Sequence, residues 1–231
     1  MKKLLFLFTY IYLCQHFCAQ AQSIITPSQW QSDLVYLQNK IHSDYTNLFH
    51  NVTTARFDSA VHVLKKEIPN LSEEEIRVGF IRLIAMFKIG HTRVGFEAGE
   101  NEGNLSPMFH FFPLTISPFR DGLFIQHIDS VYKEAVGGKL IKIGDCPVDV
   151  ALNKMHSVIP CENEQYFKSQ LHYYFRFPEI LKSLNITSSS NSVELTYHKD
   201  GSEKKIIITA RNCPGYEWYD GLFLLYCLRN N

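Results

Sequence analysis

The chain has 231 residues, and its 23 lysines and arginines are balanced by 23 aspartates and glutamates. This length fits one large domain or two small ones, at about 150 residues per domain. Hydrophobic residues make up 45% and charged residues 20%, a balance that allows a core and argues against global disorder. The formal charge of zero removes the usual electrostatic case for a nucleic-acid partner.

The first residues are typical of an export signal. Lys2 and Lys3 precede an apolar run at 4–13, which is about half of the ~20 residues that a membrane-spanning helix needs. The small residues Ala19 and Ala21 then provide a signal-peptidase site. We predict a signal peptide over 1–21, and a retained membrane anchor is the alternative. We expect no integral membrane segment after cleavage, and a location in a bacterial periplasm or outside the cell.

Cleavage would remove two lysines, no acid and two of the six cysteines, leaving a formal charge of −2. The four remaining cysteines are Cys146, Cys161, Cys213 and Cys227. Their spacing contains no CxxC pair, which disfavours zinc. An exported chain could pair them in three ways, and buried free thiols are the alternative. Since no phosphate loop, dinucleotide motif or HExxH sequence is present, we expect neither a cofactor nor a metal.

Residues 22–92 are predicted to form a helical bundle. Apolar residues recur at spacings of three and four in 27–48, ending at Tyr45, and again in 54–68. Ser72 and the three glutamates after it form a capping box that opens a third helix. Its apolar face is expected to contain Ile76, Phe80, Leu83, Ile84 and Phe87. The apolar face of each helix can be buried only against the apolar faces of the other two.

After Gly90 the sequence favours strands, so we predict an α+β fold. Strands are expected at 93–96, 109–116, 123–128 and 139–143, with a loop at 97–104. A short helix is expected at 147–155, and one or two helices within 161–184, broken near Pro178. Asp200-Gly201, between runs at 192–199 and 203–210, predicts a two-residue hairpin.

His91 is the residue most suited to chemistry, because a histidine titrates near neutrality and can act as a general base. It lies in Gly90-His91-Thr92, between the helical and strand-rich parts. A structural role at a helix end is the alternative, and the residues alone favour it. No GxSxG sequence is present. The residues alone therefore assign no reaction.

Residues 109–152 resemble a bacterial-type PDZ domain, through Asp121-Gly122-Leu123-Phe124-Ile125, the stretch 135–138 and the stretch 139–148. The resemblance implies a PDZ-like small β-barrel over 93–212, completed by the Asp200 hairpin, with a helical insertion near 161–184. It also implies that Gly122, Leu123 and Phe124 open a strand whose edge accepts a peptide. A turn leading into a buried strand is the alternative for these three residues.

The order of the whole chain resembles the C-terminal-processing, or tail-specific, serine peptidases of the tricorn-like branch. In those relatives the histidine before the PDZ domain is catalytic, and His91 is the matching position. Their Asp-x-His-Thr pattern is incomplete here, since Ile89 stands at the aspartate position and Gly90 replaces the serine found in tricorn. The stretch 222–231 resembles the segment that leads into their catalytic domain. We therefore expect 213–231 to be a linker and the nucleophilic serine to lie beyond Asn231.

Three functions follow as hypotheses. The first is the N-terminal part of an exported serine peptidase, inactive alone because the nucleophile-bearing domain is absent. The second is a non-enzymatic module that binds polypeptides or C-terminal peptides along the PDZ-like edge. The third is an unrelated exported enzyme with its site around His91.

Overall fold

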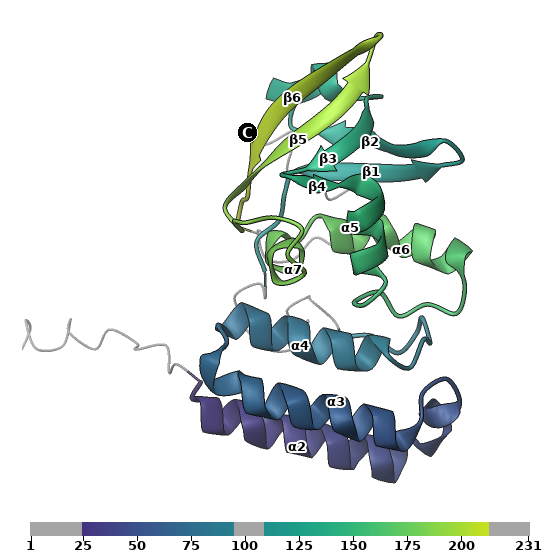
Figure 1. The fold of residues 1–231 in the computed structure, drawn as a ribbon, viewed down its shortest axis with the longest axis vertical. Helices are drawn as coiled ribbons and strands as arrows, with labels where there is room; N and C mark the ends of the chain where they lie inside the picture. Colours follow the sequence, from purple (N-terminus) through teal and green to yellow (C-terminus); the bar gives the residue numbers. More distant parts are fainter. Residues whose placement is uncertain (1–24, 95–108, 213–231) are drawn as a thin grey trace, which may run out of the picture.

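A computed structural model describes residues 25–94 and 109–212 of this chain (Figure 1). The fold is α+β, as the sequence predicts. Helices pack beside a single antiparallel sheet of six strands. The sheet is open, with β1 and β6 at its two ends, whereas the PDZ resemblance implies a small barrel. The predicted signal peptide at 1–21 and the predicted linker at 213–231 lie outside the described residues.

The first part of the chain contains α2 (Pro27–Asp44), α3 (Thr54–Glu67) and α4 (Glu73–Ala85), with short 3-10 turns at Thr46–His50 and Ile68–Asn70. The predicted capping box is confirmed. The Ser72 hydroxyl accepts from the N–H of Glu75 at 3.4 Å, and the Glu75 carboxylate accepts from the N–H of Ser72 at 2.8 Å. The first helix ends earlier than predicted, and Tyr45, expected on its apolar face, is 54% exposed.

These three helices share one apolar cluster, which we call the helical cluster. Phe57 is fully buried at its centre, with ring centroids 5.8 Å from Phe49 and 5.1 Å from Phe87. Its buried members are Leu34, Ile41, Val52, Phe57, Val61, Leu64, Ile68, Ile76, Leu83, Ile84 and Phe87. The aromatic contacts join α3 to the segments that follow α2 and α4, so they fix how the helices are connected.

The strands are β1 (Leu114–Phe119), β2 (Gly122–Ile128), β3 (Lys139–Ile143), β4 (Cys146–Pro147), β5 (Ser192–Lys199) and β6 (Ser202–Thr209). Their order is β1-β2-β3-β5-β6, and β4 pairs with β3. The predicted β5–β6 hairpin is confirmed, with Lys199 opposite Ser202. Asp200 and Gly201 both have positive φ, +53° and +75°, as a two-residue type I′ turn requires.

Three helices and a 3-10 turn, η3 (Ser130–Ala135), pack with the sheet. The helices are α5 (Val148–Met155), α6 (Glu164–Phe175) and α7 (Pro178–Ser183). The predicted break near Pro178 is confirmed. Phe177 is extended, because a residue before proline is pushed out of the helical region. The larger apolar core, which we call the sheet cluster, contains buried residues of the strands and of α5, α6 and α7.

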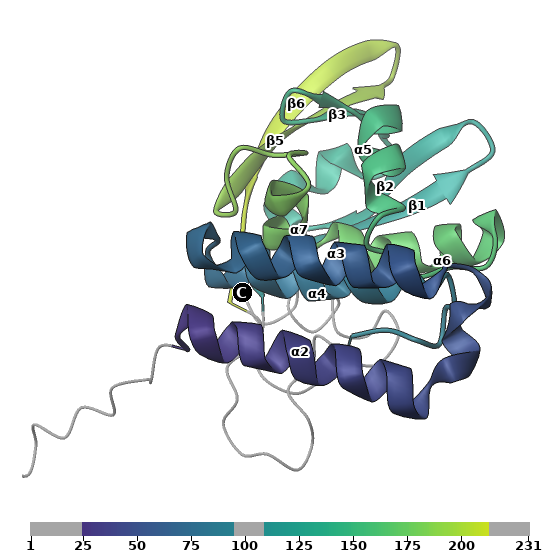
Figure 2. The ribbon, with the colours of Figure 1, turned by 60° about the horizontal axis from the view of Figure 1, so that its bottom comes forward.

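Helix α4 belongs to both cores. Ile76 and Leu83 lie in the helical cluster, while Val78 and Ile81 lie in the sheet cluster. In Figure 1 α4 lies between α3 and the layer of α5 and α7, and Figure 2 shows α3 and α4 running side by side. Since its two faces are buried against different neighbours, α4 joins the helical part to the sheet part.

The strand predicted at 109–116 begins only at Leu114. The preceding residues bond to distant segments. The N–H of Phe112 donates to the carbonyl of Arg176 at 2.8 Å, and Phe111 forms an isolated antiparallel bridge with Arg211. Arg93 and Val94 lie in no strand, and the rest of the strand predicted at 93–96 falls outside the described residues.

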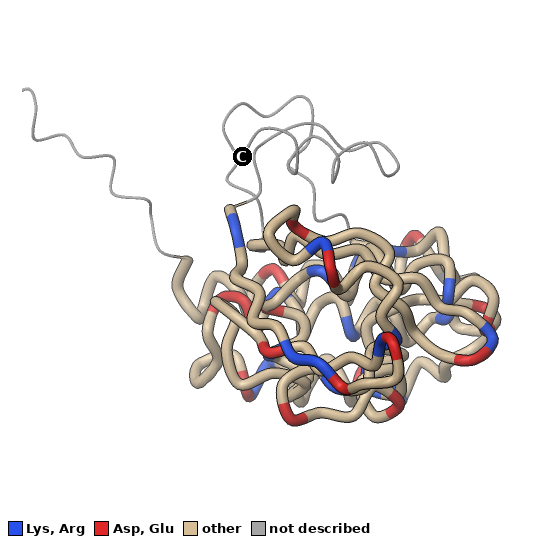
Figure 3. The backbone as a smooth tube through the Cα atoms, turned by 90° about the horizontal axis from the view of Figure 1, so that it is seen from above, with Lys and Arg blue, Asp and Glu red and all other residues tan. Residues whose placement is uncertain are grey.

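Positive and negative side chains are interspersed along the described backbone (Figure 3). No helix of the described ranges has both the length and the apolar character that crossing a membrane would need.

Candidate functional site

His91 lies where the chain leaves α4, on the surface of the junction between the two parts. Its ring centroid is 6.3 Å from that of Tyr166 in α6, with the planes tilted by 60°. Lys88, just before it, has a positive φ of +53°, which turns the chain out of the helix. The structure thus places His91 beside the start of α6.

Gly90 is held at this junction by a hydrogen bond and by a close contact with an aromatic ring. Its N–H donates to Glu162 Oε1 at 2.6 Å. The bond to the Gly90 N–H is the main reason that the pKa of Glu162 lies below its ordinary value, and the nearby charge of His91 contributes less. A Cβ on Gly90 would lie 2.3 Å from Cε1 of the Tyr166 ring, so only glycine fits without a shift.

The serines of the described residues are not activated. Ser157 donates to the carbonyl of Lys154 at 2.8 Å, and Ser169 donates to the carbonyl of Tyr166 at 2.7 Å. Within 25–94 and 109–212, no hydrogen bond joins a serine hydroxyl to a histidine or lysine side chain. A serine nucleophile needs such a base. His91 therefore has no nucleophile to activate among these residues.

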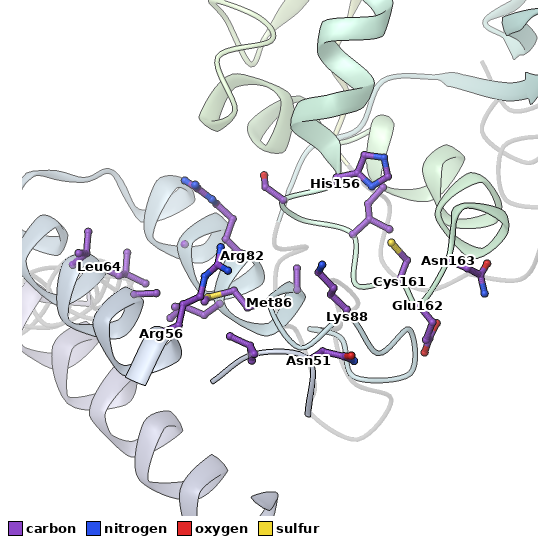
Figure 4. A pocket seen from close by; sticks show the side chains of 18 of the residues that line it. Asn51, Arg56, Leu64, Arg82, Met86, Lys88, His156, Cys161, Glu162 and Asn163 are labelled. Atoms are coloured by element: carbon purple, nitrogen blue, oxygen red, sulfur yellow. The ribbon is translucent and has the colours of Figure 1, made fainter. Parts of the chain in front are cut away.

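A groove of about 920 Å³, which we call the junction groove, opens beside Lys88 and Glu162 (Figure 4). It is lined by α3, by α4 and Lys88, and by the segment 156–164 that connects α5 to α6. His156 stacks on Phe167 at 3.7 Å between centroids and faces Glu164 at 3.7 Å. Two of the segments that line the groove, the end of α4 and residues 156–164, are thus linked by the hydrogen bond between Gly90 and Glu162.

Cys161 lies in the wall of this groove as a half-buried free thiol, and Cys146 is also free. Burial, followed by the charges of Glu164 and Glu162, raises the pKa of the Cys161 thiol. Because the thiolate is the reactive form, this environment does not favour a nucleophilic cysteine. Cys213 and Cys227 fall outside the described residues. Among those residues, no three of His, Cys, Asp and Glu are grouped so that they could hold a metal.

Gly122, Leu123 and Phe124 open β2, and they lie far along the chain from His91. They pair with Phe119, Pro118 and Ser117 of β1. Phe124 also pairs with Lys139 of β3. Gly122 and Leu123 thus pair with β1 alone, whereas Phe124 has a partner on each side. A peptide-binding edge at these three residues stays a prediction, and the ends of the sheet are β1 and β6.

One further histidine contact joins residues that no sequence pattern connects. Nδ1 of His110 lies 2.6 Å from Oε1 of Glu179, and the same oxygen accepts the backbone N–H of His110 at 3.1 Å. The Glu179 side chain is only 5% exposed, whereas that of His110 is 54% exposed. The buried carboxylate orients the ring and fixes the segment before β1. The two residues are 69 positions apart, so no local sequence motif predicts their contact.

No protein-family model matches this sequence, and a search of curated proteins finds no match.

Proposed function

We propose that this chain is the polypeptide-binding, N-terminal part of an exported serine peptidase of the tail-specific kind. The order of elements supports the proposal: three helices, then Gly90-His91-Thr92, then strands β1 to β4, the helices α5, α6 and α7, and a closing hairpin of β5 and β6. In this proposal α2, α3 and α4 are the helical bundle, and β1 to β6 are the PDZ-like region. His91 is carried over as the family's histidine, by resemblance.

Binding without hydrolysis is the activity that the geometry supports best. The hydroxyls of Ser157 and Ser169 donate to backbone carbonyls, and that of Ser117 donates to the side chain of Gln126. The sheet, in contrast, offers an open strand. The observation that carries the proposal is β6, eight residues long at the free end of an antiparallel sheet. An extended peptide can add a strand to such an end through main-chain hydrogen bonds.

The pairing of β6 shows which backbone groups are available. Lys199 and Ser202 flank the two-residue turn and form a hydrogen-bonded pair, and such pairs alternate along the hairpin. The backbone groups of Glu203, Lys205 and Ile207 therefore point away from β5. Ile207 is 58% exposed, so it offers an apolar contact beside its free N–H and carbonyl. The two charged residues limit nonspecific pairing, as charges on edge strands do.

The other end of the sheet is less suited to a peptide. Helix α6 packs along β1 and covers part of it (Figure 1, Figure 2). Pro118 in this strand lacks an N–H and lies at a position where that group would point outward. We therefore assign the peptide to β6 instead of to β1 or to Gly122, Leu123 and Phe124.

Ile207→Pro tests the assignment, with fluorescein-labelled denatured casein as the polypeptide. Proline removes an outward N–H and leaves the bonds to β5 intact, so binding should fall about tenfold or more with folding retained. Ile207→Val is the matched control and should bind like the unchanged chain. Equal binding by the proline variant would contradict the assignment to β6. Cleavage of casein that a serine reagent blocks would contradict binding without hydrolysis.

A further inference from the structure

Strand β6 presents a row of three side chains to any strand that joins this end of the sheet. Glu203, Lys205 and Ile207 lie on one face, because alternate residues of a strand point to the same side. All three are exposed. Their backbone groups are also the ones that point away from β5. An added strand would therefore form its hydrogen bonds at these positions and place its own side chains beside the row.

The charge of Lys205, in the middle of the row, is already matched within the chain. Its Nζ lies 2.7 Å from Oε1 of Glu194 on the neighbouring strand β5. The hydrogen bond to Glu194 is the main reason that the pKa of Lys205 lies above its ordinary value. A residue of an added strand that stands opposite Lys205 therefore meets a neutralised pair and needs no charge of its own.

The two other lysines of the hairpin are engaged as well. Nζ of Lys204 lies 3.5 Å from Oδ2 of Asp200 in the turn, and the Lys204 side chain points to the opposite face of the sheet. Nζ of Lys199 donates to the carbonyls of Glu134 and Val136, each at 2.8 Å. Both ammonium groups thus have oxygen partners of their own.

Glu203, at the turn end of the row, is the acid of the hairpin that has no such partner. Within 25–94 and 109–212 no ion pair includes its carboxylate. Its charge raises the pKa of Lys205 less than that of Glu194 does. His198 of β5 stands opposite Glu203 in the ladder, on the side away from an added strand. The carboxylate is therefore open to a cation on such a strand.

Ile207, at the other end of the row, offers an apolar surface. It is 58% exposed and stands opposite Glu194 of β5. Apolar β-branched side chains pack well beside one another on the pleated surface of a sheet. Glu203 and Ile207 are four residues apart, so an antiparallel strand would place the two matching side chains at the same spacing and in the reverse order.

We propose that the edge of β6 selects an extended segment in which a β-branched apolar residue precedes a lysine or arginine by four positions. This selection rests on the proposed binding of peptides at β6. The segment runs antiparallel to β6, as the paired strands of this sheet do. Its apolar side chain packs on Ile207, a neutral residue stands opposite Lys205, and its basic side chain pairs with Glu203.

The experiment uses the full chain and the fluorescein-labelled peptide Thr-Val-Thr-Thr-Thr-Lys-Thr, with binding followed by fluorescence anisotropy. A glutamate in place of the peptide's lysine should weaken binding about fivefold, because a cross-strand attraction becomes a repulsion. Glu203→Lys should reverse this preference, so that the glutamate peptide binds more tightly than the lysine peptide. Asp33→Lys is the matched control. It changes the net charge equally at an exposed position of α2, which Figure 1 shows at the opposite end of the molecule from β6.

Reversal by Glu203→Lys, with the preference unchanged in Asp33→Lys, supports the selection. Equal binding of the two peptides to the unchanged chain would overturn it, and so would a preference that Glu203→Lys leaves in place. Tighter binding of the peptide with its sequence reversed would overturn the antiparallel register. If no peptide binds while casein binds and Ile207→Pro abolishes that binding, the selection is wrong and the proposed function stands. If casein binding also survives Ile207→Pro, both are wrong.

Discussion

The helical part and the sheet part of this molecule are built from different kinds of contact. The helical cluster joins helices that follow one another closely in the chain, and its sequence signals are local. The sheet cluster joins β1 to α6 and segment 109–113 to α7 and Arg211, across about 60 to 100 residues. Helix α4 contributes to both clusters. The two parts therefore differ in whether local or distant contacts determine their structure, and yet they share helix α4.

The largest expected effect comes from Phe57→Ala, which breaks the helical cluster. Phe57 is fully buried against Phe49 and Phe87. Removing such a ring costs about 3–5 kcal/mol. Because α4 belongs to both clusters, we expect the sheet part to unfold at the same lower urea concentration. Trp30 fluorescence, measured in a Trp218→Phe background because the chain has two tryptophans, reports the helical part, and hydrogen exchange of β5 reports the sheet part. Separate midpoints would contradict the coupling through α4.

Gly90→Ala tests the junction between the two parts and should have an intermediate effect. The new methyl group would overlap the Tyr166 ring, and overpacking of this kind costs about 1–3 kcal/mol. The free energy of unfolding measured in urea gives the cost. Tyr166→Ala provides space, so Gly90→Ala should cost much less in that background than in the unchanged chain. Equal costs in the two backgrounds would show that residue 90 and the Tyr166 ring do not meet as described.

Glu162→Gln should have the smallest effect, and that effect should depend on pH. The folded pKa of Glu162 lies below its ordinary value of 4.5, mainly through the N–H of Gly90. The carboxylate therefore stabilises the fold above about pH 4.5, and this contribution is lost as the pH falls through the folded pKa. The melting temperatures of the variant and the unchanged chain should differ at pH 7 and converge in acid. Glu164→Gln controls for the loss of one charge from the same segment, and a constant difference across pH would contradict the bond.

Features that depend on a few neighbouring residues could be predicted. The Ser72 capping box, the Asp200-Gly201 hairpin and the break before Pro178 each follow from residues within about four positions. The start of β1 could not, because Phe111 and Phe112 take partners near residues 211 and 176. Tyr45 fits a helical spacing and still lies exposed, since spacing does not say where a helix ends.

The candidate sites likewise contain some features that neighbouring residues predict and others that depend on distant residues. The sequence pointed to His91 as the residue at the junction, and the structure places it there beside Tyr166. It did not predict that the carboxylate of Glu162, 72 positions from Gly90, would accept the N–H of Gly90. A peptide site at Gly122 to Phe124 stays a prediction, because a strand that opens with glycine gives no sign of which neighbours will flank it. The strand order, which depends on distant pairings, is what places β6 at an end of the sheet.

The proposed function is tested most directly by adding labelled denatured casein to the purified chain and measuring binding and cleavage in the same sample. We predict saturable binding with intact casein recovered, and loss of that binding in Ile207→Pro with retention in Ile207→Val. Cleavage blocked by a serine reagent, or binding that Ile207→Pro leaves unchanged, would contradict the account.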